Sequence, residues 1–373
     1  MQMKAIAVFP NQKAVRLIDH EEPEIAAPNQ VKMRMLEVGI CGTDRDITSF
    51  QYGFPPDGFE YLILGHESLG EVVETGADVK SVKPGDLVVT TVRRPCTHDW
   101  CIPCGAGRQD FCASGDYTER GIKQRHGFMA EFVVEEERYL NAVPRELRDH
   151  AVLTEPLTIA EKSLLQLWKI QERLPWGCPH TEAEGPGHCH KAVVLGAGPV
   201  GLLGAMALRV DGFDVTVYSR THTHENGDPI LAAIGAKFIP AETNTVDQMA
   251  QQVGRIDVVY EAVGASSLAF DVLKHLGPNA IFIFTGVPGL HAPIPVDADH
   301  IMRDMVLNNQ VAIGSVNAPP ESFAAAIRDL TEFQKRWPDA ISKLITGRFP
   351  IDQAVDPLTK NFGGIKNIIT IAA

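Results

Sequence analysis

A glycine-rich turn between a buried strand and a helix constrains the fold of this 373-residue chain more than any other feature. The stretch VVLGAGPVGLLG places Gly196, Gly198 and Gly201 in the spacing G-x-G-x-x-G, after an apolar strand and at the start of a helical segment. The first glycine permits the tight turn, the second lets the backbone approach a pyrophosphate, and the third allows close helix–sheet packing. The helix N-terminus attracts the anion. We therefore predict a dinucleotide site that includes Pro199 and Val200, with a purely structural glycine turn as the alternative.

Strand and helix patterns alternate through the second half of the chain. Apolar strand-like stretches such as KAVVL, FDVTVYS and RIDVVYE are each followed by a helical segment. This alternation predicts an α/β fold whose doubly wound parallel sheet is covered by helices on both faces. Residues 1–165 instead hold short alternating apolar stretches separated by Gly, Pro and Asp, which is typical of a mainly-β, partly open barrel.

The end of the second strand of this sheet bears on the choice of cofactor. NAD enzymes usually place an acidic residue there to hold the ribose 2′-hydroxyl. This chain has Ser219 and Arg220, followed by Thr221. A guanidinium can hold a 2′-phosphate with two hydrogen bonds, so we predict a preference for NADP with NAD as a tolerated alternative. Arg220 as a solvated surface residue, or stacked on adenine without discrimination, are the competing interpretations.

Charge and targeting signals narrow the class of partners. The net charge is −13, which disfavours nucleic acid and anionic membranes as partners. The start MQMKAIAVFP lacks a secretory pattern, and no run of about 18 apolar residues occurs. We therefore expect a cytoplasmic chain whose cysteines, seven in number, bind metal and do not form disulfides.

Four of those cysteines are concentrated in the stretch PCTHDWCIPCGAGRQDFC. Cys96, Cys101, Cys104 and Cys112 have the spacing C-x4-C-x2-C-x7-C. A short loop with four thiols gains order chiefly by binding metal, and four thiolates make a closed tetrahedral zinc site with no position left for substrate. We predict a structural zinc here; a redox role for the thiols is the alternative.

A second set of metal-binding residue types lies earlier in the chain. GICGTDRD contains Cys41 and Thr43, and LGHESLGEVV contains His66 and Glu67. A catalytic zinc keeps three protein ligands and one open position, in which a bound hydroxyl loses its proton more easily. Taken alone His66 would more often be a structural histidine, but beside Glu67 and upstream of a nucleotide fold the ligand interpretation is favoured.

The stretch PWGCPHTEAEGPGHCH, in the loop 175–190, raises a separate question. It contains Cys178, His180, His188, Cys189 and His190, which are all metal-binding residue types. Its Pro and Gly content offers no rigid scaffold to hold ligand geometry, and it has no periodicity. We therefore expect a solvated loop, with its role left open.

The order of a barrel-like domain, a nucleotide-binding domain and a returning C-terminal tail resembles that of the zinc-containing medium-chain dehydrogenases over the whole chain. The resemblance rests on GHE-x-x-G-x-x-x-x-x-G (Gly65 to Gly76), on VKPGDLV and on the glycine fingerprint. It narrows to the archaeal-type glucose 1-dehydrogenases through TVRRP, ERGI, HGFM, EPL…EK and GSVN. The resemblance implies a GroES-like catalytic domain of residues 1–165 and 338–373, with the structural zinc lobe at 92–115. A Rossmann NAD(P)-binding domain then occupies residues 166–337.

The resemblance also implies roles for individual residues. Catalytic zinc would be held by Cys41, His66 and either Glu67 or Glu155, with these two carboxylates left unranked; both, with Thr43, are candidate catalytic residues. Thr43, Glu155, Glu119 and Asn317 would contact the substrate. The implied cofactor contacts beyond the fingerprint are Phe284, Thr285, Gly286, Ser315, Val316, Asn317 and Lys366.

We thus predict NADP-preferring oxidation of an aldose, D-glucose or also D-galactose, at C1 to the lactone by zinc-assisted hydride transfer. Two zinc ions per subunit and a homodimer or homotetramer are expected. The first alternative is a zinc-dependent alcohol, polyol or L-threonine dehydrogenase, and the second is a non-catalytic NADPH-binding protein.

Overall fold

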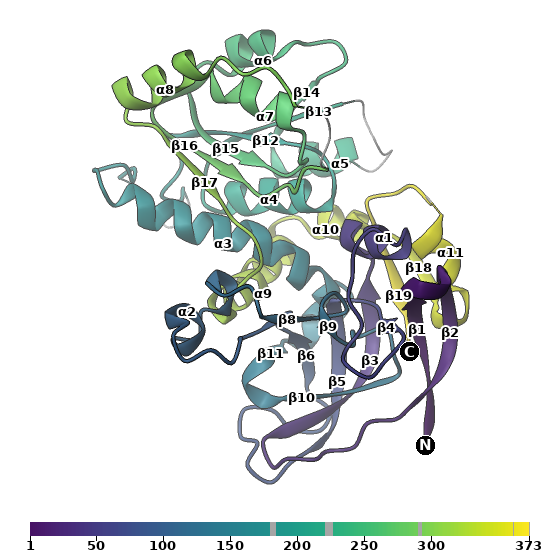
Figure 1. Ribbon diagram of the computed structural model, residues 1–373. Helices are drawn as coiled ribbons and strands as arrows, with labels where there is room; N and C mark the ends of the chain where they lie inside the picture. Colours follow the sequence, from purple (N-terminus) through teal and green to yellow (C-terminus); the bar gives the residue numbers. More distant parts are fainter. Residues whose placement is uncertain (180–183, 221–226, 290–292, 361, 373) are drawn as a thin grey trace. The chain divides into compact units, whose positions relative to one another are not determined.

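The computed structural model describes residues 1–373 except 180–183, 221–226, 290–292, 361 and 373 (Figure 1). The chain forms two compact units: unit 1 is Met1–Thr158, Asn317–Thr331 and Ile345–Ala373, and unit 2 is Ile159–Val316 and Glu332–Leu344. The first change of unit lies inside helix α3 (Thr154–Gln171), a few residues before the boundary expected at 165. Residues 317–331, which we had placed in the nucleotide-binding domain, also pack with unit 1. A continuous helix carries no sequence signal for where its contacts change.

Unit 1 is mainly β-structure, as the short alternating stretches predicted. Its strands are β1 (Gln2–Phe9), β2 (Ala14–Glu21), β3 (Gln30–Gly39), β4 (Leu62–Ile63), β5 (Glu67–Thr75), β6 (Leu87–Thr90), β7 (Arg93–Arg94), β8 (Thr118–Arg120), β9 (Gln124–Arg125), β10 (Phe132–Glu136), β11 (Leu140–Val143), β18 (Ile345–Pro350) and β19 (Lys366–Thr370). Its helices include α1 (Gly42–Thr48), α2 (Ile102–Gly105), α11 (Val355–Thr359) and the first part of α9 (Pro320–Arg336).

Strand β3 organises the largest sheet of unit 1. Its sequence QVKMRMLEVG alternates apolar and polar residues, and its apolar side chains are buried. It pairs antiparallel with β5, β10 and β19, so the C-terminal strand of the chain completes the sheet of the first domain. The core of this unit includes Met33, Met35 and Val38 from β3 and Phe128 and Ile369 from elsewhere.

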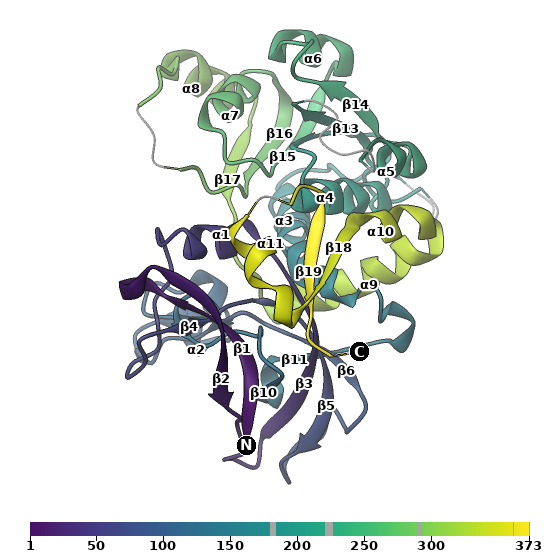
Figure 2. The ribbon, with the colours of Figure 1, turned by 90° about the vertical axis from the view of Figure 1, so that its right-hand side faces the viewer.

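Unit 2 is a parallel sheet with helices on both faces. Its strands follow the order β14-β13-β12-β15-β16-β17 and pair in parallel throughout. Helices α6, α7 and α8 lie on one side of the sheet, and α4 and α5 lie on the other (Figures 1 and 2). The elements are β12 (Lys191–Leu195), α4 (Pro199–Val210), β13 (Asp214–Ser219), α5 (Gly227–Ile234), β14 (Lys237–Pro240), α6 (Val246–Val253), β15 (Ile256–Glu261), α7 (Ser266–Leu273), β16 (Leu276–Phe284), α8 (Ala298–Leu307), β17 (Val311–Gly314) and α10 (Pro338–Leu344). The predicted α/β fold class is confirmed.

Two helices of unit 2, α6 and α8, were not expected from the apolar pattern. Each begins with a local cap. The Thr245 hydroxyl accepts the Gln248 amide at 3.3 Å, and the Gln248 side chain accepts the Thr245 amide at 2.9 Å. Asp297 in turn accepts the amide of His300 at 3.2 Å. Capping and packing onto the sheet therefore form these helices where the hydrophobic pattern is weak.

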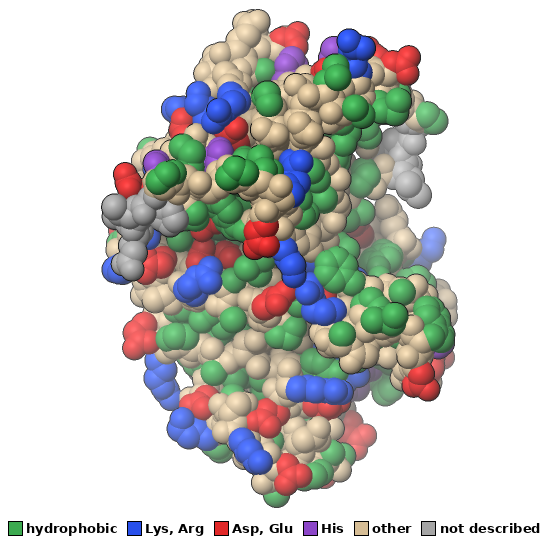
Figure 3. Space-filling view, turned by 90° about the vertical axis from the view of Figure 1, so that its left-hand side faces the viewer, with side chains coloured by type: hydrophobic (Ala, Val, Ile, Leu, Met, Phe, Trp, Pro, Cys, Tyr) green, Lys and Arg blue, Asp and Glu red, His purple; other side chains and the backbone are tan. Residues whose placement is uncertain are grey.

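Acidic, basic and apolar side chains are interspersed on the face shown in Figure 3. Among the described residues, no helix combines the length and hydropathy that crossing a bilayer requires.

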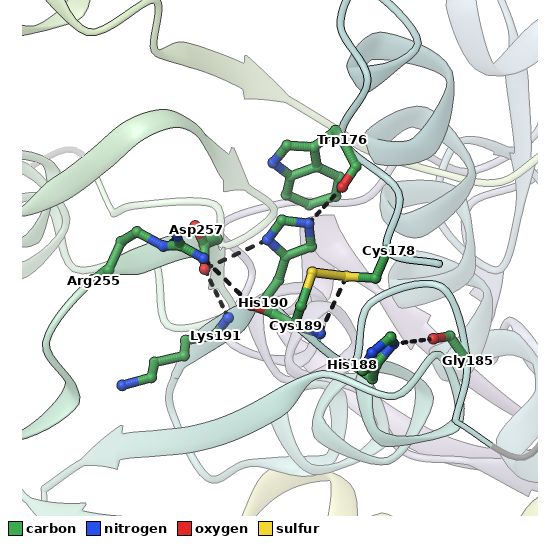
Figure 4. The surroundings of a disulfide bond; sticks show 9 residues. All are labelled: Trp176, Cys178, Gly185, His188, Cys189, His190, Lys191, Arg255 and Asp257. Carbon is green, nitrogen blue, oxygen red and sulfur yellow. Dashed lines mark hydrogen bonds and ion pairs between the residues drawn. A yellow bond between two sulfur atoms is a disulfide. The ribbon is translucent and has the colours of Figure 1, made fainter. Parts of the chain in front are cut away.

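The loop 175–190 corrects two expectations. Cys178 and Cys189 form a disulfide with their Cα atoms 6.0 Å apart, so not every cysteine is free as we expected (Figure 4). Trp176, Cys178 and His190 are buried, so this part of the loop is not a solvated one. The loop is held by the turn that follows α4, a contact that the local sequence did not predict. The Gly187 amide donates to the Asp211 carbonyl of that turn at 2.9 Å. His180 lies outside the described residues.

Candidate active site and metal centres

The four-cysteine lobe brings its sulfur atoms to one point. The Sγ atoms of Cys96, Cys101, Cys104 and Cys112 lie within 4.8 Å of one another, and all four cysteines are free. The short helix α2 turns the chain between them, and the Ala113 amide donates to Cys101 Sγ at 3.4 Å. Four thiols this close without a disulfide fit a tetrahedral zinc site. The structure thus assembles the set that the spacing predicted.

A second cluster joins Cys41, His66 and Glu67, whose ligand atoms lie within 4.8 Å of one another. Cys41 precedes the first turn of α1, and Glu67 opens β5. Gly65 has a φ of +89°, and a Cβ there would meet the side chains of Met129 and Val38 at 2.7 Å. This turn therefore requires glycine, and it aims the two following side chains at Cys41.

Asp44 completes this cluster, although no role was assigned to it from the sequence. It is fully buried; Oδ2 accepts the Cys41 amide at 2.8 Å, and Oδ1 lies 3.6 Å from His66 Nδ1. Burial alone would lower the pKa of His66, but the Asp44 carboxylate and Cys41 raise it well above its usual range. The same negative potential that attracts a proton attracts a metal cation, so these residues fit a zinc ion. Asp44 orients the imidazole for it.

Lys366 lies in this cluster as well. It was expected to contact the cofactor, but its Nζ lies 2.7 Å from both carboxylate oxygens of Glu67 and 3.1 Å from the Ile40 carbonyl. Both partners are buried. Glu67 therefore already has an internal counter-ion, which the sequence separation of 299 residues hid from local analysis.

Glu155 and Thr43 lie near the same centre. Burial, with the nearby charge of Glu67, raises the pKa of Glu155 to about 7, although His66 and Lys366 act to lower it. A carboxyl group with that pKa can hold or release a proton near neutral pH. Thr43 lies in the first turn of α1, with its Oγ1 3.9 Å from Cys41 Sγ.

The two residues predicted to bind sugar hydroxyls meet across 198 positions of sequence. Asn317 Nδ2 donates to Glu119 Oε1 at 3.2 Å, and Asn317 adopts a left-handed backbone with φ of +59°. Arg93, to which no role was assigned, donates from Nε to the same Glu119 oxygen at 3.0 Å. Its guanidinium also stacks over Tyr117 at 3.6 Å from the ring centroid. Arg93 thus fixes the carboxylate.

A backbone contact ties this polar pair to the metal-binding turn. Gly121 directly follows β8, the strand that carries Glu119, and has a φ of +71°. A Cβ on Gly121 would overlap the backbone of Gly65, the residue before His66. The sugar-binding candidates and the Cys41–His66–Glu67 cluster therefore belong to one part of unit 1.

In unit 2, the predicted cofactor residues follow the carboxyl ends of parallel strands. Gly196 has a φ of +102°, and a Cβ on Gly201 would overlap the Gly196 carbonyl, so both positions require glycine. A Cβ on Gly198 would meet nothing within 4 Å, which leaves its backbone open to a ligand. The first turn of α4 contains Pro199 and Val200. This is the edge at which parallel sheets bind dinucleotides.

Other predicted cofactor residues end or directly follow strands of this sheet, whereas Asn317 and Lys366 belong to unit 1. Ser219 ends β13 and is followed by the exposed Arg220; Thr221 lies outside the described residues. Phe284 ends β16, and Ser315 follows β17 and donates its amide to the Phe284 carbonyl at 2.9 Å.

Two side chains that hold the backbone of this region in place were not predicted from the sequence. Glu261 accepts the amides of Val263 and Gly264 at 2.7 Å and that of Gly286 at 3.2 Å, and its carbonyl accepts the Thr285 hydroxyl. Lys162 donates to the carbonyl of Val316 at 2.8 Å. Gly286 lies 25 positions from Glu261 and Val316 lies 154 positions from Lys162, so no local motif marks these two contacts.

Known proteins are similar to this chain in sequence and in fold. The family described as alcohol dehydrogenase GroES-like domain matches residues 27–145, and the family described as glucose dehydrogenase C-terminus matches residues 148–371. The glucose 1-dehydrogenase of Methanocella arvoryzae is 37% identical over 372 residues, covering 100% of both chains. That of Metallosphaera sedula is 38% identical over 370 residues, covering 98% of each. The Haloferax mediterranei glucose dehydrogenase, solved with NADP, Zn and gluconolactone, superposes with a TM-score of 0.87 at 30% identity over 100% of both chains.

These matches, with the site geometry, place the chain in the class of zinc-containing medium-chain dehydrogenases, as the resemblance implied. Within that class, the chain belongs to the glucose dehydrogenase family. The predicted enzyme class, an NAD(P)-dependent zinc dehydrogenase of the glucose 1-dehydrogenase type, is thereby confirmed.

Proposed function

We propose that this chain oxidises an aldose at C1 to the lactone, with D-glucose as the first candidate, D-galactose as the second, and NADP as the preferred acceptor. One observation carries the proposal: the buried Glu119 and the half-buried Asn317, which are hydrogen-bonded to each other, stand beside the turn that presents His66 and Glu67. A carboxylate and an amide in such a place match a substrate with several hydroxyl groups, because polar groups are costly to bury without polar partners.

The metal-binding residues divide into a closed and an open set. The four-cysteine lobe would hold a structural zinc, and Cys41 and His66 with one carboxylate would hold the catalytic one. When bound, this zinc makes a hydroxyl more acidic and the nicotinamide accepts a hydride. Thr43, next to Cys41, is placed to pass on the hydroxyl proton. Asp44 keeps the imidazole of His66 in position.

The two candidate carboxylates differ in their surroundings. Glu67 lies within ligand distance of Cys41 and His66, but its charge is matched by Lys366. Glu155 forms no lysine or arginine ion pair among the described residues. The largest influences on its pKa are burial, which raises it, and the charge of His66, which lowers it. We therefore propose that Glu155 approaches the metal or its water. Glu67 instead stays paired with Lys366 and does not bind the metal while that ion pair is intact. Zinc content of Glu155→Gln and Glu67→Gln separates the two roles, because only loss of the resident ligand lowers metal affinity.

The cofactor edge favours NADP through Ser219 and Arg220, which stand where an acidic residue would hold a 2′-hydroxyl. Arg220 is exposed in the structure, so its guanidinium is accessible to a phosphate. Thr221, Phe284, Thr285, Gly286, Ser315, Val316 and Asn317 are retained as proposed cofactor contacts. The Lys366 contact is the weakest of the set, since its ammonium is buried against Glu67.

A steady-state survey tests the proposal. Zinc-replete protein is given aldoses, simple alcohols, polyols and L-threonine with NADP or NAD, and we expect turnover of aldoses with the higher kcat/KM for NADP. Turnover of simple alcohols with none for aldoses would favour the alcohol or polyol alternative. A third outcome is that the wild type turns over no substrate, and that His66→Ala loses metal but still binds NADPH. This outcome would favour a non-catalytic NADPH-binding protein.

A homo-oligomer and a cytoplasmic location stay predictions. Strand β17 is the edge of the parallel sheet, and the neighbouring α8 exposes Met302, Val306 and Leu307 with more than 60% of each surface accessible. An apolar helix beside an open strand edge is a surface that a second copy would cover. Light scattering of the wild type and of Val306→Glu tests this: the variant should lower the measured mass.

A further inference from the structure

The disulfide loop contains a cluster that the proposed activity does not use. Ligand atoms of Cys178, Cys189 and His190 lie within 4.8 Å of one another, with the two sulfur atoms bonded to each other in the disulfide. Zinc–sulfur bonds of about 2.3 Å hold two thiolates farther apart than a disulfide does, so these sulfur atoms can share an ion only after that bond is broken. Figure 4 shows the imidazole of His190 beside the two sulfur atoms.

The histidine is held as metal-binding histidines are. Its ring stacks on Trp176 with centroids 4.0 Å apart, and its Nε2 lies 2.7 Å from the Trp176 carbonyl. Nδ1 is buried without a hydrogen bond and lies 3.6 Å from Asp257 Oδ2. Asp44 stands at the same 3.6 Å from Nδ1 of His66. A carboxylate behind one ring nitrogen orients the other toward a metal.

That carboxylate is itself fixed. Asp257 Oδ2 accepts the Lys191 amide at 2.9 Å, and Oδ1 pairs with Arg255 Nε at 2.8 Å. When Nε2 takes an ion in place of the Trp176 carbonyl, Asp257 is in position to hold the proton on Nδ1. His190 thus needs only a small change of partner to act as a ligand.

The sulfur environment repeats a feature of the four-cysteine lobe. The Cys189 amide donates to Cys178 Sγ at 3.1 Å, as the Ala113 amide does to Cys101 Sγ at 3.4 Å. A hydrogen bond from a backbone amide favours the charged form of sulfur, which is the form that binds metal. Two features of the predicted zinc centres, the carboxylate behind the imidazole and the amide on the sulfur, therefore recur in this loop.

We propose that Cys178, Cys189 and His190 form a third zinc site, which excludes and is excluded by the disulfide. A dithiol reductant transfers two electrons and two protons to the Cys178–Cys189 bond, giving two thiols and the oxidised, cyclic reductant. Zinc then displaces the two thiol protons and binds two thiolates and the imidazole, with water in the fourth position. Thiolate and imidazole ligands select zinc over the hard cations.

The position of the site defines its role as structural. It precedes β12, whereas the glycine fingerprint follows that strand, roughly 16 Å away for five residues in a β-strand. The ion would tie the loop after α3 to the start of β12, in place of the covalent bond. It would not touch the substrate.

Zinc content decides the question. The full chain is divided into unreduced and dithiol-reduced samples, loaded with excess zinc without oxygen, desalted and analysed for metal. We expect one additional zinc per chain in the reduced sample. A cobalt-loaded reduced sample should also gain thiolate-to-cobalt absorption that the unreduced sample lacks.

Variants assign the extra ion. Cys189→Ser should show no additional zinc in either state, whereas Cys104→Ser should lose zinc from the lobe and still gain one on reduction. Equal zinc content of reduced and unreduced wild type would overturn the proposal, because the third site can form only after reduction. This comparison uses the wild type alone, so it does not depend on whether a variant folds. A gain that persists in Cys189→Ser would overturn it as well.

Discussion

Unit 1 pairs buried carboxylates with buried arginine and lysine side chains, whereas the core of unit 2 is mainly apolar and its buried Glu261 is held by backbone amides. In unit 1 the Glu135 carboxylate, with none of its side chain exposed, lies 2.5 Å from Arg94 Nη2 and 2.9 Å from Arg120 Nε. In unit 2 the core consists of apolar strand and helix residues such as Val193, Val259 and Phe282. Its covalent restraint is the Cys178–Cys189 disulfide.

The difference follows from what each unit has to present. Unit 1 contains the candidate metal ligands and the proposed sugar-binding residues, so charged side chains enter its interior, where burial without a partner would carry a large desolvation cost. Unit 2 presents backbone amides and loops at one edge of a sheet, which an apolar core can support. We therefore expect acid and metal removal to act on unit 1, and reduction to act on unit 2.

Removing one thiol from the lobe should have the largest effect. Cys104→Ser takes a buried ligand from α2, and structural zinc binding is worth on the order of 10 kcal/mol of local folding free energy. We expect loss of one zinc per chain and fast hydrogen exchange over residues 92–115. Exchange in unit 2 should not change. Retention of full zinc content would contradict the closed tetrahedral site.

Breaking the buried ion-pair network should come next. Glu135→Gln leaves Arg94 and Arg120 buried without their carboxylate, which costs about 3–5 kcal/mol. Burial alone would raise the pKa of Glu135, but Arg120 and Arg94 lower it to about 2. Its contribution is therefore complete above about pH 4.5 and is lost as pH falls toward 2.

Denaturant unfolding at pH 7 measures the change, with unit 1 followed by hydrogen exchange. Glu136→Gln on the same strand is the matched control, because its partner Arg138 is largely exposed and such pairs contribute little. Equal stability of the two variants would show that the buried network is not what holds unit 1.

Opening the disulfide should weaken unit 2 by a smaller amount. Cys178 and Cys189 are 11 positions apart, and closing a loop of that length restrains the unfolded chain by about 3 kcal/mol. We expect Cys189→Ser, assayed with its lobe zinc bound and no zinc added, to lower the unfolding midpoint of unit 2 while residues 92–115 stay protected. A dithiol should reproduce the effect in wild type assayed without added zinc and add nothing in the variant. If the dithiol destabilised the wild type and Cys189→Ser equally, the Cys178–Cys189 disulfide would not be the target of the dithiol.

The smallest effect concerns His126, a partly buried histidine of unit 1. Burial, with the charges of His20 and Arg120, lowers the pKa of His126 to about 4. The unfolded chain therefore takes up a proton between about pH 6.5 and 4 that the folded chain does not, and stability falls over that range by about 2 kcal/mol. His126→Phe should flatten this part of the stability–pH curve. His300→Phe, an exposed position, should leave the slope unchanged.

The predictable parts of this molecule are those carried by local spacing. The Gly196–Gly201 turn needs its glycines because of bond geometry, and the strands beside it are recognised from their apolar runs. The four cysteines of the lobe lie within 17 residues, so the chain between them is too short to carry them apart. Glu119 and Asn317 were each assigned to the sugar hydroxyls through family resemblance, and their contact with each other came only from the structure.

What the sequence determined by itself was the order of the elements, the nucleotide edge and the identity of the metal-binding residue types, because these depend on neighbours within a turn or a strand. Only the tertiary structure decided that Lys366 pairs with Glu67, that Asp44 supports His66 and that Arg93 fixes Glu119. It also joined Cys178 to Cys189 on a scaffold supplied by the turn after α4. Partners of buried charges are chosen by packing between distant segments, and a single sequence does not record which segments will meet.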